Sequence, residues 1–157
     1  MELAERVERL SKVSLFAGLT QPALELIARI AAEESHPLGT IIFQHGQLGD
    51  KLYVILEGRI RISRNVPGMG EEALAILGPG AVFGEMALID SAPRSADARV
   101  HERCRVLGLP KDGFEDLLFL QKDLAYEVLW SFVRMLTVRL RETNDKLTFL
   151  SVTGKFE

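Results

Sequence analysis

Apolar residues follow two different spacings along the chain. In residues 2–32 they recur at helical spacing, broken by Gly18 and restarted at Thr20, which is typical of two short amphipathic helices. From about 38 to 110, short β-branched and aliphatic runs alternate with glycine-rich turns, a pattern that indicates a compact antiparallel sandwich or barrel. From 111 onward the helical spacing returns.

These spacings predict a single α+β domain that covers 1–157. The chain has 157 residues, of which 47% are apolar, enough to bury a core without a disulfide or a structural metal. We expect N-terminal helices in 1–36, an antiparallel β-roll or jelly-roll barrel in 37–110, and C-terminal helices in 111–157. The fold class is therefore a roll flanked by N-terminal helices and one long C-terminal helix.

The long helix is expected over 124–150, and its apolar positions alternate in steps of three and four. That spacing is typical of a two-helix seam and predicts a homodimer. The alternative is that the stripe packs only on its own roll. About 27 residues would span about 40 Å, which exceeds the width of such a roll and favours the dimer. The stripe consists of Leu129, Phe132, Leu136, Leu140, Thr143, Leu147 and Leu150.

Composition and charge exclude several classes of function. The net charge is −3 and no apolar run reaches the length of a membrane span, so we expect no general attraction to nucleic acid and no membrane partner. A single cysteine, Cys104, and the lack of an export signal favour a cytoplasmic protein. His36, His45 and His101 are scattered, so we expect no metal site and no cofactor. No nucleophile–base pair is evident, and we predict that the chain is not an enzyme.

Residues 83–96, here called the cassette, carry the candidate chemistry. Gly84 permits close approach of the backbone, and the residues after it can form one helical turn with outward N–H groups. Arg94 stands among small residues, so a ligand can reach its guanidinium, whose planar fork matches a phosphate. Glu85 lies nine residues earlier and can accept hydrogen bonds from a sugar hydroxyl. Together these residues indicate a ribose–phosphate clamp.

The cassette strongly resembles the phosphate-binding segment of the cyclic nucleotide-binding domain family, which includes catabolite activators and protein kinase A regulatory subunits. The family pattern is approximately F-G-E-[LM]-A-L-[IL]-x-x-x-P-R-[SAT]-A, and FGEMALIDSAPRSA matches every specified position. GDKLYVILEGRIRI resembles the family's β-roll core and LFAGLTQPALELIA its N-terminal helices, so the resemblance covers almost the whole chain. The ligand-binding residues that it implies here are Phe83, Gly84, Glu85, Met86, Ala87, Pro93, Arg94 and Ser95.

The resemblance also implies a role for individual residues. Arg94 is expected to bind the cyclic phosphate, assisted by the N–H groups of Ala87 and Ser95. Glu85 is expected to accept from the ribose 2′-OH, with the backbone of Gly84 against the ribose. A buried pair of Glu85 with Arg94 would be costly without ligand, so we expect the ligand-free site to be wet or mobile.

Recognition of the base is implied by a second resemblance. RLRETNDK, residues 139–146, resembles the part of the long helix with which bacterial catabolite activators recognise adenine. The implied residues are Thr143 and Asn144, one of them reaching across the dimer. The alternative is that Thr143 merely interrupts the apolar stripe and Asn144 is a surface residue. Ser95 stands where members that prefer cGMP often carry threonine, which favours cAMP as the ligand.

The expected function is that of a bacterial cAMP sensor that acts on an unknown effector through its long helix. Residues 147–155 resemble the hinge that precedes a helix-turn-helix domain in activators, and the sequence stops there. We therefore expect no direct DNA binding by this chain, which is either a stand-alone sensor or the sensor half of a longer protein. The alternatives are an interaction module with a vestigial site, or a site for cGMP or a cyclic dinucleotide. A cupin-like enzyme is disfavoured by the histidine arrangement.

Overall fold

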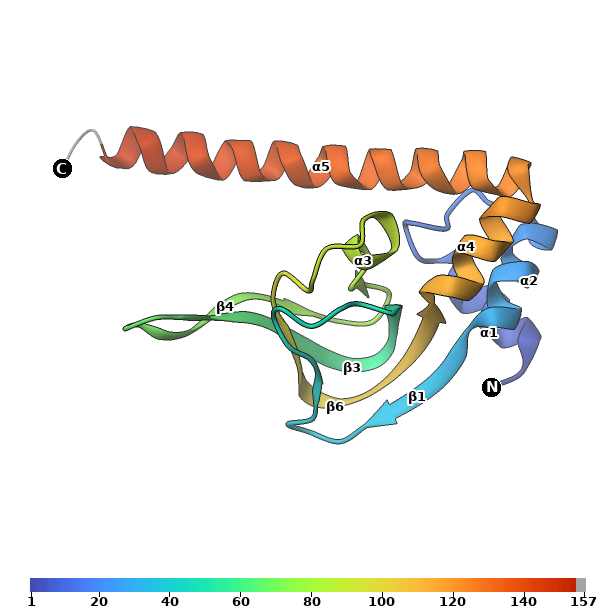
Figure 1. Cartoon of the computed structure of the whole chain (residues 1–157), viewed down its shortest axis with the longest axis horizontal. Helices are drawn as coiled ribbons and strands as arrows, with labels where there is room; N and C mark the ends of the chain where they lie inside the picture. The colour runs from blue at the N-terminus through green and yellow to red at the C-terminus, as the bar shows by residue number, and fades with distance from the viewer. Residues whose placement is uncertain (155–157) are drawn as a thin grey trace.

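Figure 1 shows the computed structural model of the chain, which describes residues 1–154. A curved antiparallel sheet lies below one very long helix, and a group of shorter helices closes one end of the sheet (Figure 1). The end of the predicted C-terminal segment, residues 155–157, lies outside the described residues. The helices are α1 (Leu3–Ser11), α2 (Gln21–Ile30), α3 (Met86–Ile89), α4 (Lys111–Leu120) and α5 (Lys122–Gly154).

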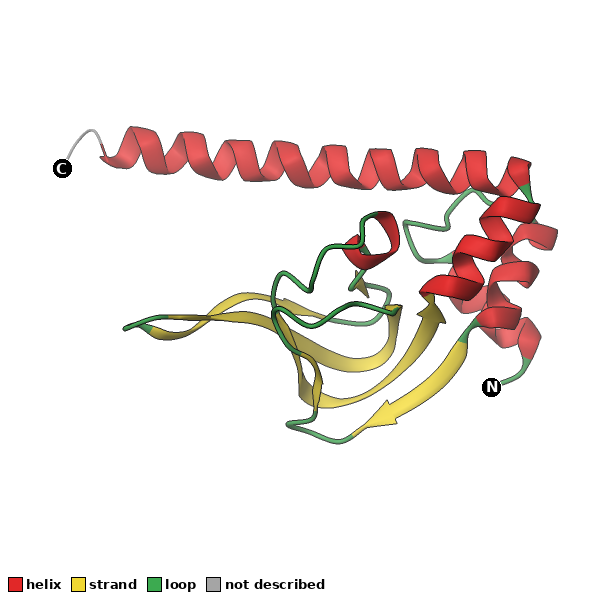
Figure 2. Cartoon of the chain, in the orientation of Figure 1, coloured by secondary structure: helices red, strands yellow, loops and turns green. Residues whose placement is uncertain are grey.

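Within residues 1–154 the sheet has six strands, and all of their pairs are antiparallel. The strand order is β1-β6-β3-β4, with β2 paired to β6 and β5 paired to β3. Figure 2 shows how the sheet curls beneath the helices. This arrangement confirms the predicted α+β class with an antiparallel roll. The strands are β1 (Ala32–His36), β2 (Ile41–Phe43), β3 (Lys51–Val66), β4 (Gly70–Leu77), β5 (Val82–Phe83) and β6 (Asp97–Pro110).

Three predicted boundaries were wrong. β1 lies inside 1–36, where only helices are expected from the sequence, because the polar sequence AEESH is set by its pairing with β6 and not by an apolar alternation. The sequence predicts only short runs in 38–110, whereas residues 97–110 form one 14-residue strand, β6. The long helix exceeds 124–150 at both ends, since α5 runs from Lys122 to Gly154.

In the part of the chain that the structure describes, the core consists of two clusters of buried apolar side chains. The larger one joins the sheet to the helices and includes Phe16, Ile27 and Phe114. The smaller one lies within the roll and includes Phe43 and Phe83. The cassette therefore begins at a residue, Phe83, that is anchored in the core of the roll.

The two halves of α5 have different surroundings. Leu124, Val128 and Phe132 are buried against the rest of the domain, whereas no side chain from Val133 to Gly154 is buried. The predicted stripe is divided in the same way, because Phe132 packs on its own domain while Leu140 is 61% exposed. Among residues 1–154, no helix is both long enough and apolar enough to cross a membrane.

Candidate functional site

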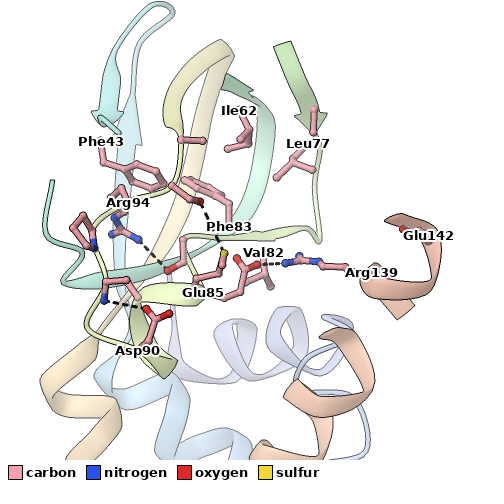
Figure 3. Close-up of a pocket in the computed structure, with 18 residues that line it drawn as sticks. Phe43, Ile62, Leu77, Val82, Phe83, Glu85, Asp90, Arg94, Arg139 and Glu142 are labelled. Carbon is pink, nitrogen blue, oxygen red and sulfur yellow. Dashed lines mark hydrogen bonds and ion pairs between the residues drawn. The ribbon is translucent and has the colours of Figure 1, made fainter. Parts of the chain in front are cut away.

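A cavity of about 500 Å³ lies between the roll and α5 (Figure 3). All eight cassette residues that we proposed as ligand contacts line it. The other walls come from β2, β3, β4 and β5 and from α5. The complete lining is Phe43, Ile62, Ala75, Leu77, Val82, Phe83, Gly84, Glu85, Met86, Ala87, Asp90, Ala92, Pro93, Arg94, Ser95, Ala96, Arg139 and Glu142.

Arg94 is a buried cation whose partners in the described chain are neutral. Its side chain is 6% exposed, and its guanidinium donates to the carbonyl oxygens of Gly84 at 3.0 Å and Lys51 at 2.8 Å. The same guanidinium lies 4.0 Å from the centre of the Phe43 ring. Its Nε is buried without a hydrogen-bond partner in the described chain. Burial lowers the pKa of Arg94, because removal from water disfavours the charged form.

The loop between β2 and β3 supports Arg94 from behind. The Arg94 N–H donates to the Gln47 carbonyl at 2.7 Å, and the Gly46 N–H donates to the Arg94 carbonyl at 2.9 Å. A Cβ on Gly49 would overlap the Cβ of Ala87 and lie 2.8 Å from Cζ of Arg94. Gly49 is therefore a positioning residue for the cassette. In the sequence Gly49 is one of several glycines in the turns between 38 and 110, and nothing local links it to Arg94.

Gly84 has a specific conformational role at the start of the cassette. Its φ of +75° lies in the left-handed region that side chains with a Cβ rarely adopt. A Cβ there would lie 2.7 Å from Nη1 of Arg94 and 3.2 Å from the Lys51 carbonyl oxygen. The glycine thus lets the chain turn into α3 while the arginine lies against its backbone.

Glu85 pairs with α5 and not with Arg94. Its side chain is buried, and the position of α5 over the roll brings the Arg139 guanidinium into an ion pair with its carboxylate (Figure 3). Our expectation of a costly Glu85–Arg94 pair was therefore wrong, since each residue has separate partners. Sequence reasoning also missed Arg139, although it opens the 139–146 segment, because its approach to Glu85 depends on how α5 lies.

The structure does not bring Thr143 and Asn144 to the cavity of a single chain. Both side chains are exposed, and the Thr143 hydroxyl donates to the backbone carbonyl of Arg139 at 2.9 Å. The α5 residues that do line the cavity are Arg139 and Glu142. Base recognition by Thr143 and Asn144 therefore stays a prediction about an assembly of two chains.

The cavity changes in chemical character from one side to the other. We call the part around Arg94, Gly84 and Ala87 the phosphate end, after the group that the sequence predicts there, and the part around Arg139 and Glu142 the helix end. Aromatic rings lie behind the phosphate end, where the Tyr53 and Phe83 rings stack with centroids 5.0 Å apart. Burial raises the pKa of the Tyr53 hydroxyl to about 12. The apolar side chains toward the helix end are Ile62, Ala75, Leu77 and Val82. A ligand that joins an anion, a hydroxylated sugar and a flat apolar base would match this sequence of surfaces.

The chain shows similarity to known proteins over most of its length. The profile of the cyclic nucleotide-binding domain family matches residues 33–120. The chain is 38% identical over 137 residues to the cyclic AMP receptor protein of Thermus thermophilus, a match that covers 87% of this chain and 62% of the relative. It is 30% identical over 146 residues to the CRP-like cAMP-activated global transcriptional regulator of Mycobacterium tuberculosis, covering 93% of this chain and 63% of the relative.

The fold is also that of a solved relative. The crystal structure of Thermus thermophilus catabolite activator protein superimposes with a TM-score of 0.77 at 35% identity, covering 88% of this chain and 63% of that one. The chain therefore belongs to the cyclic nucleotide-binding domain family. It spans less than two thirds of the length of these regulators.

Proposed function

We propose that this chain binds a 3′,5′-cyclic nucleotide, cAMP, and serves as a regulatory domain without catalytic activity. The observation that supports this function best is the buried Arg94, which has no carboxylate within ion-pairing distance in the described chain. A buried charge without a counter-charge is unfavourable, and two carbonyl bonds offset this only in part. The cyclic phosphate supplies the missing charge and an acceptor for the remaining donors.

The ribose is proposed to lie beside Glu85 and Gly84. A carboxylate accepts but does not donate, so Glu85 is suited to the 2′-hydroxyl group. Gly84 has no Cβ and leaves the ribose free to approach its backbone. A ligand that lacks the 2′-hydroxyl leaves the buried Glu85 with one fewer hydrogen bond, so 2′-deoxy-cAMP is expected to bind poorly.

Ligand occupancy is proposed to reach an effector through α5. The ribose hydroxyl and Arg139 both use the Glu85 carboxylate, so ligand binding bears directly on the contact that ties α5 to the cassette. A ligand shifts α5 only if it binds two positions of the helix with different affinity. The exposed apolar residues after Val133 are proposed to form a homodimer seam, which would place Thr143 and Asn144 near the partner chain.

Calorimetric titration of nucleotide-free protein tests this function. The ligands are cAMP, cGMP, a cyclic dinucleotide and 2′-deoxy-cAMP. We expect saturable binding of cAMP in preference to the others. Arg94→Ala should remove measurable cAMP binding, because the phosphate loses its charged partner, while Arg103→Ala removes the same group from an exposed position on β6 and should leave affinity unchanged.

Each other outcome of the titration has a definite meaning. If cGMP binds best, the phosphate and ribose sites stand and the base assignment is wrong. If Arg94→Ala binds cAMP as tightly as the wild type, the assignment of the site is wrong. If no ligand binds the wild-type protein, the chain is an interaction module with a vestigial site.

A further inference from the structure

A second cavity, of about 590 Å³, lies along α5 outside the proposed nucleotide site. Its walls come from α5, from the segment between α1 and α2, and from the loop between β4 and β5. Among the described residues that line it, none belongs to the cassette or to the predicted stripe on α5. The cyclic nucleotide and the partner helix are therefore both proposed to lie elsewhere.

Arg134 supplies an available positive charge in the second cavity. In the described chain its guanidinium forms no ion pair, whereas the other arginine of the lining, Arg139, is paired with Glu85. Arg134 also lines an adjoining hollow that includes Trp130, the single tryptophan of the chain. A guanidinium can donate two parallel hydrogen bonds to a carboxylate. The second cavity thus offers a site for an anion beside α5.

Beyond Arg134 the walls of the second cavity are mainly apolar. They include Ala81, Val82, Met135 and Val138, and the flexible side chain of methionine adapts to ligands of different shape. The backbone N–H groups of Gly80 and Ala81 are already bonded to carbonyl oxygens of the same chain. A peptide needs partners for its own N–H and C=O groups, whereas a hydrocarbon group does not. These walls therefore suit a hydrocarbon group better than an extended peptide.

Glu142 limits the length of the hydrocarbon group. It lies eight positions after Arg134, which is about 12 Å along the helix axis. Because a carboxylate repels an anion, the anionic head group belongs at Arg134 and the apolar part must end before Glu142. We propose that the second cavity binds a small amphipathic carboxylate, with its head group on Arg134 and its hydrocarbon group between Val82 and Val138. This inference concerns a separate site and goes beyond the proposed cyclic-nucleotide function.

A ligand in the second cavity contacts the helix that is proposed to carry the signal. α5 forms one wall of both cavities, and Arg139 and Glu142 line both of them. The two sites are thermodynamically coupled if the second ligand prefers one position of α5, and the coupling is then reciprocal.

Ligands that differ only in the head group test the second site. Octanoate, octanol and octylamine share one hydrocarbon group and carry a negative charge, no charge and a positive charge at neutral pH. Each is titrated into the protein and followed by NMR, with the backbone amides and the indole N–H of Trp130 as reporters. The same titrations use Arg134→Ala, Arg134→Lys and Arg141→Ala. Arg141 is on the same helix but lines neither cavity, so it is the matched control.

The wild type is expected to bind octanoate about fivefold more tightly than octanol, the upper part of the range for an ion pair at an exposed arginine. Octylamine should bind no more tightly than octanol. Arg134→Ala should lower the affinity for octanoate to that for octanol, Arg134→Lys should keep most of the preference, and Arg141→Ala should keep all of it. The amide signals that shift should come from residues 80–82 and 130–138.

The cassette offers a competing cation, because Arg94 also lies in a cavity with apolar walls. Arg94→Ala separates the two sites, since octanoate should bind this variant as tightly as the wild type. If octanoate loses affinity in Arg94→Ala and not in Arg134→Ala, the carboxylate binds in the nucleotide cavity and the inference is wrong. Equal affinity of the wild type for octanoate and octanol also overturns it. Failure of cAMP to bind overturns the proposed function alone and leaves the second site standing.

Discussion

The two ends of the cavity are built in opposite ways. At the phosphate end, Arg94 is buried and bonded to the backbones of β3 and the cassette, and the β2–β3 loop closes on it with two further backbone hydrogen bonds. At the helix end, Arg139 and Glu142 project from a part of α5 in which no side chain is buried. One end is thus a rigid part of the roll, and the other belongs to a helix held over the roll by few contacts.

Under the proposed function, this difference separates a part of the site that binds from a part that responds to binding. Groups that are held in place by their own packing bind a ligand without first losing conformational freedom. A helix with few buried side chains has a low local stability, and such elements are the ones that move in regulation. The ion pair of Glu85 with Arg139 joins the two ends, so it is the contact through which ligand binding is proposed to affect α5. Four predictions test this comparison.

The largest expected effect concerns what covers the exposed part of α5. Leu140→Glu places a charge on the apolar stripe, at a side chain that is 61% exposed in the single chain. If a second copy covers the stripe, the dimer dissociation constant should rise by about 100-fold, since each copy would bury an unpaired carboxylate. Light scattering with size-exclusion chromatography measures the change. Arg141→Glu is the control, because Arg141 is the next residue along the helix and does not belong to the stripe. A wild type that is monomeric at high concentration would contradict the seam.

The next effect tests the rigidity of the phosphate end. Gly49→Ala introduces a Cβ that overlaps Ala87 and approaches Arg94, and overpacking of this kind costs about 2 kcal/mol. We expect cAMP affinity to fall by about 30-fold while the fold is kept. Gly78→Ala is the matched control, since a Cβ there meets nothing within 4 Å. Wild-type affinity in Gly49→Ala would show that the phosphate end adapts easily.

A smaller effect is expected at the link between the two ends. Arg139→Ala leaves the buried Glu85 without its ionic partner, but Arg139 is itself 45% exposed, and screening by water reduces the loss to about 1 kcal/mol. The melting temperature of the ligand-free protein should fall by about 2–4 °C. Amide hydrogen exchange in residues 133–154 should become faster. Arg141→Ala serves as control, and unchanged exchange in Arg139→Ala would mean that this ion pair does not hold α5.

The smallest effect is expected at Thr143, whose hydroxyl is bonded to its own helix. If a second chain brings Thr143 to a base, Thr143→Ala removes one net hydrogen bond. It should then weaken cAMP binding by about threefold and reduce discrimination against cGMP. In the Leu140→Glu background, Thr143→Ala should cause no further loss of cAMP affinity, because the seam is then broken. Calorimetry on both backgrounds measures this. An equal loss on the two backgrounds would place the role of Thr143 within one chain.

Features that depend on local sequence were predictable, whereas a strand specified by its partner was not. The cassette is continuous, so its glycine, carboxylate and arginine were recognisable as a unit, and all eight proposed residues line the cavity. The roll and the helices were also predictable, because apolar spacing reflects local geometry. By contrast β1 was missed, since a polar strand of this kind is specified by its pairing with β6 and not by its own pattern.

By itself the sequence determined the order of the helical and β-rich regions and the local character of residues 83–96. Both depend on neighbours close along the chain, through turn conformation and the periodicity of burial. The tertiary structure decided that Gly49 supports Arg94, that Glu85 pairs with Arg139, and that Glu142 and not Thr143 lines the cavity of a single chain. These contacts join segments far apart in the sequence, and they depend on the path of one loop and the rotation of one helix, which no local pattern of residues specifies.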